Sequence, residues 1–273
     1  MTALRFDRVS KEYRRGNESI QAFANIDLNI QDREFVALLG PSGCGKTTML
    51  RLFAGLEYPT SGEVLVGDRQ VLGPGPDRAV VFQQFALFPW MTVRQNIEFG
   101  LKCMGADKAT RCDRSVHYID LMGLSGHEDA FPSQLSGGMQ QRVAIARSYA
   151  INSEVLLMDE PFAALDTQTR QIMQEALADL IVREPRTVLF VTHSVEEALY
   201  LADRVIVLGA RPARVRTSLD ISATRRSECW NQQLSTSLLS NAKFNEIRAS
   251  IWEILREEIS KERGITNNKK MPN

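Results

Sequence analysis

The chain has 273 residues, of which 44% are hydrophobic and 24% charged, and Lys+Arg and Asp+Glu each number 33. This composition is typical of a folded globular protein and excludes a disordered or collagen-like chain, while the zero net charge disfavours a strongly basic nucleic-acid binder. A membrane-spanning helix needs about 20 mostly apolar residues, and every apolar run here is far shorter, so we expect no spanning segment.

Short runs of aliphatic and β-branched residues predict buried strands, because continuous apolar runs are typical of a sheet covered on both faces. In chain order these runs are residues 35–39, 64–66, 79–82, 155–158, 188–191 and 205–208. Helices are predicted between some of them, at residues 47–56, 171–183 and 195–202. This alternation predicts an α/β fold with a mainly parallel sheet.

Three further regions depart from the alternating pattern. Residues 4–30 and 62–71 contain short strands with turns, which predicts a smaller antiparallel β subdomain beside the core. Residues 85–150 carry apolar residues at helical spacing and no strand run, which predicts an inserted α-helical subdomain. We expect one main domain over residues 1–217 and a C-terminal extension over 218–273. The extension has a helical apolar stripe at Phe244, Ile247, Ile251, Ile254 and Ile259.

Residues 40–47 read GPSGCGKT, fit the pattern GxxxxGK[ST] and directly follow the predicted strand at 35–39. Glycines let consecutive backbone N–H groups turn toward a phosphate, and the following helix directs its positive end at the same anion. Lys46 is expected to reach the β- and γ-phosphates, and the Thr47 hydroxyl to bind Mg²⁺. The alternative is a glycine-rich turn without a ligand. The expected nucleotide-binding residues are Gly40, Pro41, Ser42, Gly43, Cys44, Gly45, Lys46, Thr47 and Thr48.

Two adjacent carboxylates follow the apolar run at residues 155–158. Because neighbouring residues of a strand point to opposite sides, Asp159 and Glu160 are expected to have different roles. Asp159 is the natural Mg²⁺ partner, and Glu160 is the candidate general base for an attacking water. The alternative is a pair that caps the following turn.

Residues 135–142 read LSGGMQQR and precede the LLMDEP segment by about twenty residues. Together with the GPSGCGKT loop, this arrangement resembles the ATP-binding cassette (ABC) family. The resemblance covers about residues 4–217 and implies a P-loop NTPase core that binds and hydrolyses ATP with Mg²⁺. The region 1–217 would then be the nucleotide-binding domain.

The resemblance also implies roles for residues outside the phosphate loop. Tyr13 matches the aromatic residue that stacks on adenine, although it could instead be a packing residue of the β subdomain. Gln83 matches the Q-loop glutamine that senses γ-phosphate, Mg²⁺ and water. His193 matches the switch histidine, and Asp166 the D-loop aspartate that crosses to a partner subunit.

The LSGGM segment, which we call the signature, directly precedes a second predicted helix. Its residues Ser136, Gly137 and Gly138 are therefore expected to form another helix start with free N–H donors. In the family, the signature of one subunit caps the γ-phosphate bound by the other, in a head-to-tail dimer. ATP binding would close this dimer and hydrolysis would reopen it. Met139 stands where the commonest pattern has glutamine, and Ala163 where many relatives have serine.

Residues 73–90 and 210–215, with the LSGGM variant, are similar to the nitrate/sulfonate/taurine-type importers. That resemblance implies an ATPase bound peripherally at the cytoplasmic face of the inner membrane. Its partners would be a second ATPase subunit, integral membrane permease subunits and, indirectly, a periplasmic or lipid-anchored solute-binding protein, with no nucleic acid. The aromatic residues between 85 and 90 are expected beside the permease groove, and the alternative is that they only pack the helical insertion. The alternative is an ABC-type ATP-dependent switch that acts on a soluble partner or nucleic acid.

Overall fold

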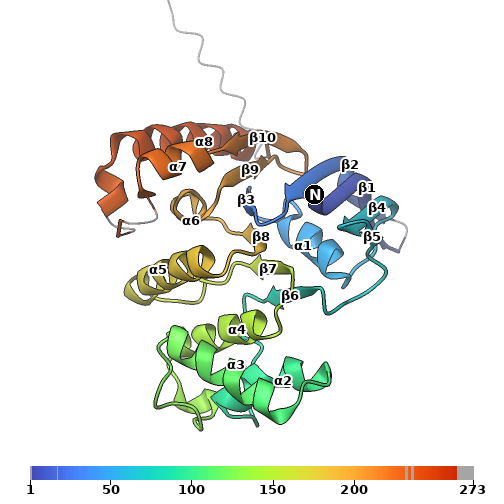
Figure 1. Ribbon diagram of the computed structural model, residues 1–273. Helices are drawn as coiled ribbons and strands as arrows, with labels where there is room; N and C mark the ends of the chain where they lie inside the picture. Colours follow the sequence, from blue (N-terminus) through green and yellow to red (C-terminus); the bar gives the residue numbers. More distant parts are fainter. Residues whose placement is uncertain (1, 17, 231–232, 235–236, 263–273) are drawn as a thin grey trace, which may run out of the picture.

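The computed structural model describes residues 2–16, 18–230, 233–234 and 237–262, and Figure 1 shows how their helices and strands are arranged. A six-stranded sheet has the order β10-β9-β3-β8-β7-β6, and a four-stranded sheet has the order β2-β1-β4-β5. None of the helices in the described ranges combines the length and the apolar character that crossing a bilayer requires. The fold is therefore α/β with two sheets, as the sequence predicted.

The six-stranded sheet is parallel except at one edge. Its parallel strands are β3 (Phe35–Leu39), β6 (Arg78–Val81), β7 (Val155–Asp159), β8 (Thr187–Val191) and β9 (Arg204–Leu208). Each matches a predicted run to within one residue. The edge strand β10 (Val215–Asp220) pairs antiparallel with β9 and was not predicted, because its sequence VRTSLD contains no apolar run.

The four-stranded sheet is antiparallel throughout, as predicted for residues 4–30 and 62–71. Its strands are β1 (Thr2–Arg15), β2 (Glu18–Gln31), β4 (Ser61–Val66) and β5 (Arg69–Gln70). The apolar run at residues 64–66 belongs to β4 of this sheet, as predicted for residues 62–71. An apolar run shows that a strand is buried but leaves open which sheet buries it.

Alternate residues of the central strands pack into two separate cores. Phe35, Ala37 and Leu39 face a core that contains α5 (Thr167–Arg183), α6 (Val195–Leu201) and the inserted helices. Val36 and Leu38 face the opposite core, between the sheet and α1 (Lys46–Ala54) with the antiparallel strands. Both faces of the parallel sheet are therefore covered, which explains why its strands are continuously apolar.

The inserted segment forms a separate group of helices below the sheet in Figure 1. Its elements are α2 (Val93–Cys103), α3 (Lys108–Leu121), the short 3₁₀ helix η1 (Pro132–Gln134) and α4 (Gly137–Ala150). Thr92 and Gln95 form a capping box that starts α2, and Asp107 caps α3 by accepting a hydrogen bond from the Thr110 N–H. Helix α4 begins at Gly137, two residues before the start that the sequence predicted.

The residues after β10 fold onto the central sheet rather than standing apart from it. They form α7 (Ser222–Ser227), the 3₁₀ helix η3 (Ser237–Ser240) and α8 (Ala242–Glu262). Trp230 and Phe244 are buried and pack edge to face with ring centroids 5.2 Å apart. Ile251 is fully buried in the same core, and Ile247 and Ile254 pack against it. The expected boundary at residue 217 falls inside β10.

Candidate functional site

The glycine-rich loop joins the end of β3 to the start of α1 and lines one wall of a hollow of about 230 Å³. Gly45 directly precedes α1 with φ near +103°, a backbone conformation that residues with a Cβ rarely adopt. The loop chain can therefore turn sharply into the helix. The residues that line the hollow are Tyr13, Ile20, Ala22, Ser42, Gly43, Gly45, Lys46, Thr47, Thr48, Glu160 and Arg211.

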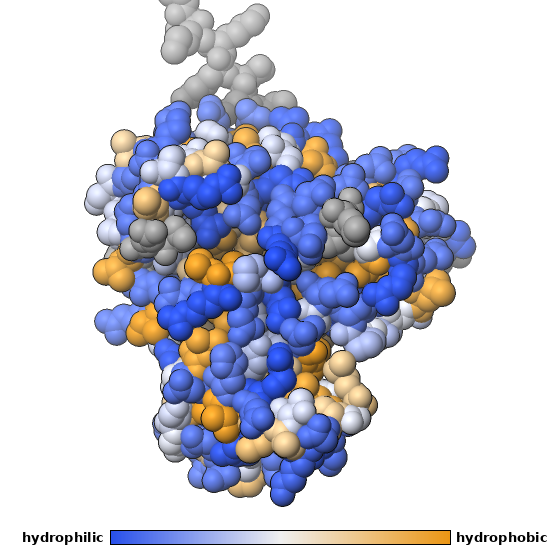
Figure 2. Space-filling view, viewed as in Figure 1, coloured by the Kyte–Doolittle hydropathy of each residue, from blue (hydrophilic) through white to orange (hydrophobic). Residues whose placement is uncertain are grey.

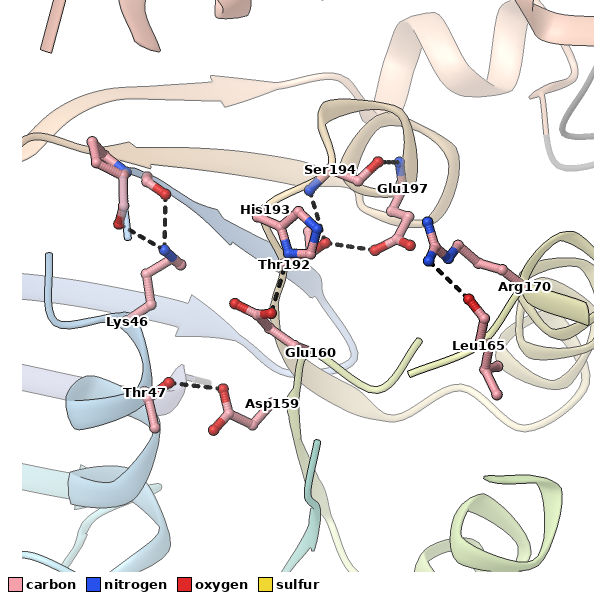
Figure 3. A network of polar contacts seen from close by, with 12 residues as sticks. Lys46, Thr47, Asp159, Glu160, Leu165, Arg170, Thr192, His193, Ser194 and Glu197 are labelled. Carbon is pink, nitrogen blue, oxygen red and sulfur yellow. Dashed lines mark hydrogen bonds and ion pairs between the residues drawn. The ribbon is translucent and has the colours of Figure 1, made fainter. Parts of the chain in front are cut away.

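Lys46 is the first residue of α1, and its ammonium group folds back over the loop. Its Nζ donates hydrogen bonds to the carbonyl oxygens of Gly40 at 2.8 Å and Pro41 at 2.9 Å (Figure 3). The side chain is only 6% exposed, and no carboxylate within the described residues forms an ion pair with it. A buried cation held by neutral carbonyls beside helix N–H groups provides a site for an anion.

Thr47 and Asp159 meet although they lie on different elements. The Thr47 hydroxyl donates to Asp159 Oδ1 at 3.0 Å, which joins the first turn of α1 to the end of β7 (Figure 3). Burial raises the pKa of Asp159, the hydrogen bond from Thr47 opposes this, and the nearby Glu160 charge adds to it. A hydroxyl beside a buried carboxylate is a hard-oxygen donor set of the kind that Mg²⁺ prefers.

Glu160 turns away from Asp159, as predicted, but for a different reason. The strand β7 ends at Asp159, and Glu160 has φ near +45°, so its direction follows from a left-handed turn rather than from strand alternation. Its N–H donates to the Val191 carbonyl at 2.9 Å. Its carboxylate Oε2 lies 3.1 Å from His193 Nδ1 (Figure 3). The structure thus joins Glu160 and His193, which sequence reasoning had assigned separately.

The buried carboxylate of Glu197 binds Thr192, the residue before His193, and the sequence reasoning missed it. The hydroxyl of Thr192 donates to Glu197 Oε2 at 2.5 Å, and Gln174 Nε2 donates to Glu197 Oε1 at 3.1 Å. Burial raises the pKa of Glu197, whereas these hydrogen bonds lower it. Ser194 and Glu197 have the sequence spacing of a capping box, and this spacing could have drawn attention to Glu197 at the start of α6.

Tyr13 lies on β1 at the rim of the hollow. Its hydroxyl donates to Glu57 Oε2 at 2.5 Å and lies 3.2 Å from Thr48 Oγ1, so the ring is fixed beside α1. Burial and the Glu57 hydrogen bond raise its pKa. The side chain remains 39% exposed, unlike a core residue, and this favours the prediction that it contacts a base over the packing alternative.

The structure places three predicted sites outside this hollow. Gln83 is exposed and lies two residues after β6, which pairs in parallel with β7, so it follows the same end of the sheet as Asp159. Ser136 caps α4 through a hydrogen bond from the Met139 N–H, and Gly137 and Gly138 begin that helix. Asp166 caps α5 through the Gln168 and Thr169 N–H groups, and these bonds lower its pKa.

Taken together, the strand–loop–helix geometry and the paired polar side chains define a P-loop nucleotide-binding protein with a helical insertion. A family model described as ABC transporter matches residues 23–163. The uncharacterized ABC transporter ATP-binding protein MJ0412 of Methanocaldococcus jannaschii is 48% identical, over 94% of this chain and 93% of its own length. The chain therefore belongs to the ABC transporter family, and its reaction is ATP hydrolysis.

Relatives with more specific names extend this comparison. The nitrate import ATP-binding protein NrtD of Synechocystis is 52% identical over 75% of this chain and 77% of its own length. The taurine import ATP-binding protein TauB of Rhizobium johnstonii is 42% identical over 88% and 91%. Among solved structures, the dimeric post-hydrolysis state of the cassette MJ0796 bound to ADP and Pi has a TM-score of 0.70 at 34% identity. It covers 80% of this chain and 98% of that one.

Proposed function

We propose that this chain is the ATP-hydrolysing energy-coupling subunit of a bacterial importer for a small anion or small organic solute, such as nitrate, a sulfonate, taurine or bicarbonate. The names of the relatives NrtD and TauB support this solute class. The observation that carries the proposal is the meeting of Lys46, the Thr47–Asp159 pair and the Glu160–His193 pair around one hollow. No observation favours the alternative of a switch that acts on a soluble partner or nucleic acid.

Mg²⁺ fits the oxygen donors at this site. Thr47 Oγ1 and the carboxylate of Asp159 would hold it, directly or through water, and Gln83 follows the neighbouring strand at the same edge of the sheet. Bound Mg²⁺ would neutralise charge on the β- and γ-phosphates. Lys46 would exchange its two loop carbonyls for phosphate oxygens, because charged acceptors bind an ammonium group more strongly than neutral ones.

Glu160 is proposed as the general base that takes a proton from the attacking water. Its carboxylate lines the hollow and is held by His193, whose side chain is 61% exposed at the rim. Thr192, anchored on Glu197, fixes the backbone next to His193. Any movement of α6 would therefore reach the Glu160 carboxylate through this histidine.

The signature residues and Asp166 are proposed to act on the nucleotide of a second subunit. In a single chain neither Ser136 nor Asp166 is among the residues that line the hollow. Ser136 stands at the start of α4, whose N–H groups can bind an anion, whereas Asp166 stands at the start of α5 and its own carboxylate accepts from the Gln168 and Thr169 N–H groups. Gly138 is so closely packed that a Cβ would lie 2.3 Å from Thr169 Cγ2. The dimeric cassette MJ0796 supports a working dimer, formed with a second copy or a close paralogue.

A mostly apolar groove between the core and the inserted helices is proposed to receive the permease. It is lined by Leu56, Phe82, Phe88, Phe99 and Ile151, among others. Phe88 packs against Phe99 with ring centroids 4.4 Å apart. Figure 2 shows hydrophobic groups between the sheet and the helical subdomain on a face that is otherwise largely polar. Such a groove fits an amphipathic helix from a partner.

This docking would hold the chain peripherally at the cytoplasmic face of the inner membrane. A periplasmic or lipid-anchored solute-binding protein would then deliver solute to the other side of the permease. Phe85 and Leu87 pack against the chain's own core, whereas Phe88 lines the groove and Trp90 is 69% exposed. The aromatic segment is therefore divided between packing and a free surface.

The proposal is tested by reconstituting this chain in proteoliposomes with the permease subunits and solute-binding protein of a nitrate or taurine importer. We expect uptake of nitrate, taurine or bicarbonate that depends on ATP. Leu56→Asp, which places a charge in the groove, should weaken permease association about tenfold or more while basal ATPase activity stays within about twofold. Val116→Asp, on the exposed face of α3, is the matched control and should bind like the wild type. Equal permease binding by Leu56→Asp and wild type would contradict the assignment of the groove.

A further inference from the structure

The connection between β9 and β10 brings an arginine to the phosphate loop. This connection is fixed at both ends, because the Gly209 N–H donates to the Arg214 carbonyl at 2.9 Å and the Ala213 N–H donates to the Ala22 carbonyl of β2 at 2.8 Å. Ala213 is 2% exposed. Arg211 therefore projects from an anchored turn rather than from a free loop.

Arg211 faces the same hollow as Lys46. Its Nε donates to the Gly43 carbonyl at 2.6 Å, and its side chain lines the hollow with Lys46, Thr47 and Glu160. Within the described ranges this is its one hydrogen bond, and no carboxylate there pairs with it. A guanidinium carries five N–H donors, so four remain for a ligand.

Neighbouring arginines on the same hairpin behave differently. Arg214 and Arg216 both pair with Glu258 of α8, at 3.7 Å and 3.0 Å. Glu258 is 1% exposed, and its Oε2 also accepts a hydrogen bond from the Ala210 N–H at 3.3 Å. The Glu258 carboxylate therefore binds the hairpin through Arg214, Arg216 and the Ala210 N–H. Arg211 does not contact it and is directed at the phosphate loop.

Among the residues that the structure describes, Lys46 and Arg211 are the two cationic side chains that line the hollow. The one carboxylate among these described lining residues, Glu160, is already engaged by His193. Two cations beside the N–H groups of a helix start match the charge of a polyphosphate better than one cation does. The guanidinium plane can also bind two oxygens of one phosphate through two parallel N–H groups, a fixed geometry that an ammonium group lacks.

We propose that Arg211 is a second cationic ligand of the ATP polyphosphate, and that Glu258 is its positioning residue on α8. This inference rests on the ATP site described above and extends it to a residue to which the sequence analysis assigned no role at the nucleotide. The C-terminal helix thereby acts on the nucleotide site through the hairpin, although α8 itself does not line the hollow.

The test measures dissociation constants of fluorescent ATP, ADP and adenosine for the full-length chain at physiological ionic strength. Arg211→Ala should weaken ATP binding about tenfold, as expected for loss of a charge-assisted hydrogen bond, and leave adenosine binding unchanged. Arg211→Lys keeps the charge and should recover most of the affinity. Arg211→Gln keeps a donor for Gly43 but no charge, and should remain weak. Arg226→Ala, an exposed arginine on α7, controls for the loss of net charge.

Glu258→Gln provides an independent readout of positioning. It should weaken ATP binding about threefold in the wild-type background and have no further effect in Arg211→Ala, because coupled residues are not additive. ATP affinity of Arg211→Ala within twofold of wild type would overturn the proposal, as would full recovery by Arg211→Gln. Failure of the importer proposal is separate, because it would leave these binding ratios intact while uptake with the permease failed.

Discussion

Two carboxylates that are neighbours in the chain reach different partners at the nucleotide site. Asp159 ends β7 and contacts Thr47, whereas Glu160 leaves the strand through a left-handed turn and contacts His193. Asp159 is 9% exposed, so its charge is held in a poorly hydrated position that a cation would relieve. The proposed metal-binding and water-activating roles would thereby fall to two adjacent residues with different partners.

Glu160→Gln should retain ATP binding and lose about 10²- to 10⁴-fold in turnover, the usual contribution of a general base. The amide has nearly the same shape and can still contact His193, but it cannot accept the proton of water. Steady-state kcat and ATP titration measure the two effects separately. Lys46→Ala is the complementary control and should lose ATP binding itself. Turnover of Glu160→Gln at the wild-type rate would show that another group is the base.

At the level of the element, α8 is an integral part of the core rather than an appended helix. Phe244 and Ile251 are buried against the central sheet's helical face, and Glu258 is tied to the β9–β10 hairpin. The polar face of α8 carries charged residues such as Lys243 and Glu246, which form an ion pair at 2.9 Å. Four of the five predicted stripe residues, Phe244, Ile247, Ile251 and Ile254, thus pack on the chain's own core, whereas Ile259 is half-buried and is not part of it.

Ile251→Ala should lower the free energy of unfolding by about 2–5 kcal/mol, because it removes a fully buried side chain and leaves a cavity. Urea denaturation followed by circular dichroism measures this change. The adjacent Trp252 is 37% exposed, so Trp252→Ala should cost much less despite its larger side chain. Equal losses for the two variants would mean that α8 is not oriented as described.

For the whole molecule, the position of the signature supports the proposal that two subunits share each ATP site. The helix start at Ser136 carries N–H donors, and neither Ser136 nor Asp166 lines the chain's own hollow. A second subunit in head-to-tail orientation would bring them to the nucleotide. To move such a dimer from 1:99 to 99:1 closed, ATP must favour the closed state by about 5.5 kcal/mol.

Glu160→Gln with ATP should therefore elute as a dimer, since the nucleotide binds but is not consumed. Size-exclusion chromatography with light scattering measures the mass directly. Lys46→Ala with ATP, and Glu160→Gln without nucleotide, should both remain monomeric. A monomer in the ATP-loaded Glu160→Gln sample, even after addition of a paralogous cassette, would contradict the shared-site proposal.

The local sequence was sufficient to predict the elements whose structure depends only on residues nearby in the chain. The strand at residues 35–39, the glycine loop and the start of α1 follow from apolar runs, glycine freedom and helix geometry within about twenty residues. The motifs also pointed to Tyr13, Glu160 and His193. The structure places Tyr13 and Glu160 at one hollow and His193 against Glu160, and their roles toward ATP stay predictions. The strand β10 was not predicted, because an exposed edge strand needs no apolar run.

The sequence by itself therefore determined which residues make a phosphate loop and which runs become buried strands, because these depend on neighbours along the chain. Only the tertiary structure decided that Arg211 contacts Gly43, 168 residues away. It also decided that Glu258 of α8 binds the β9–β10 hairpin, which carries Arg211. Such contacts are set by how sheets and helices stack. Charged side chains on exposed turns carry no periodic signal that would reveal their partners.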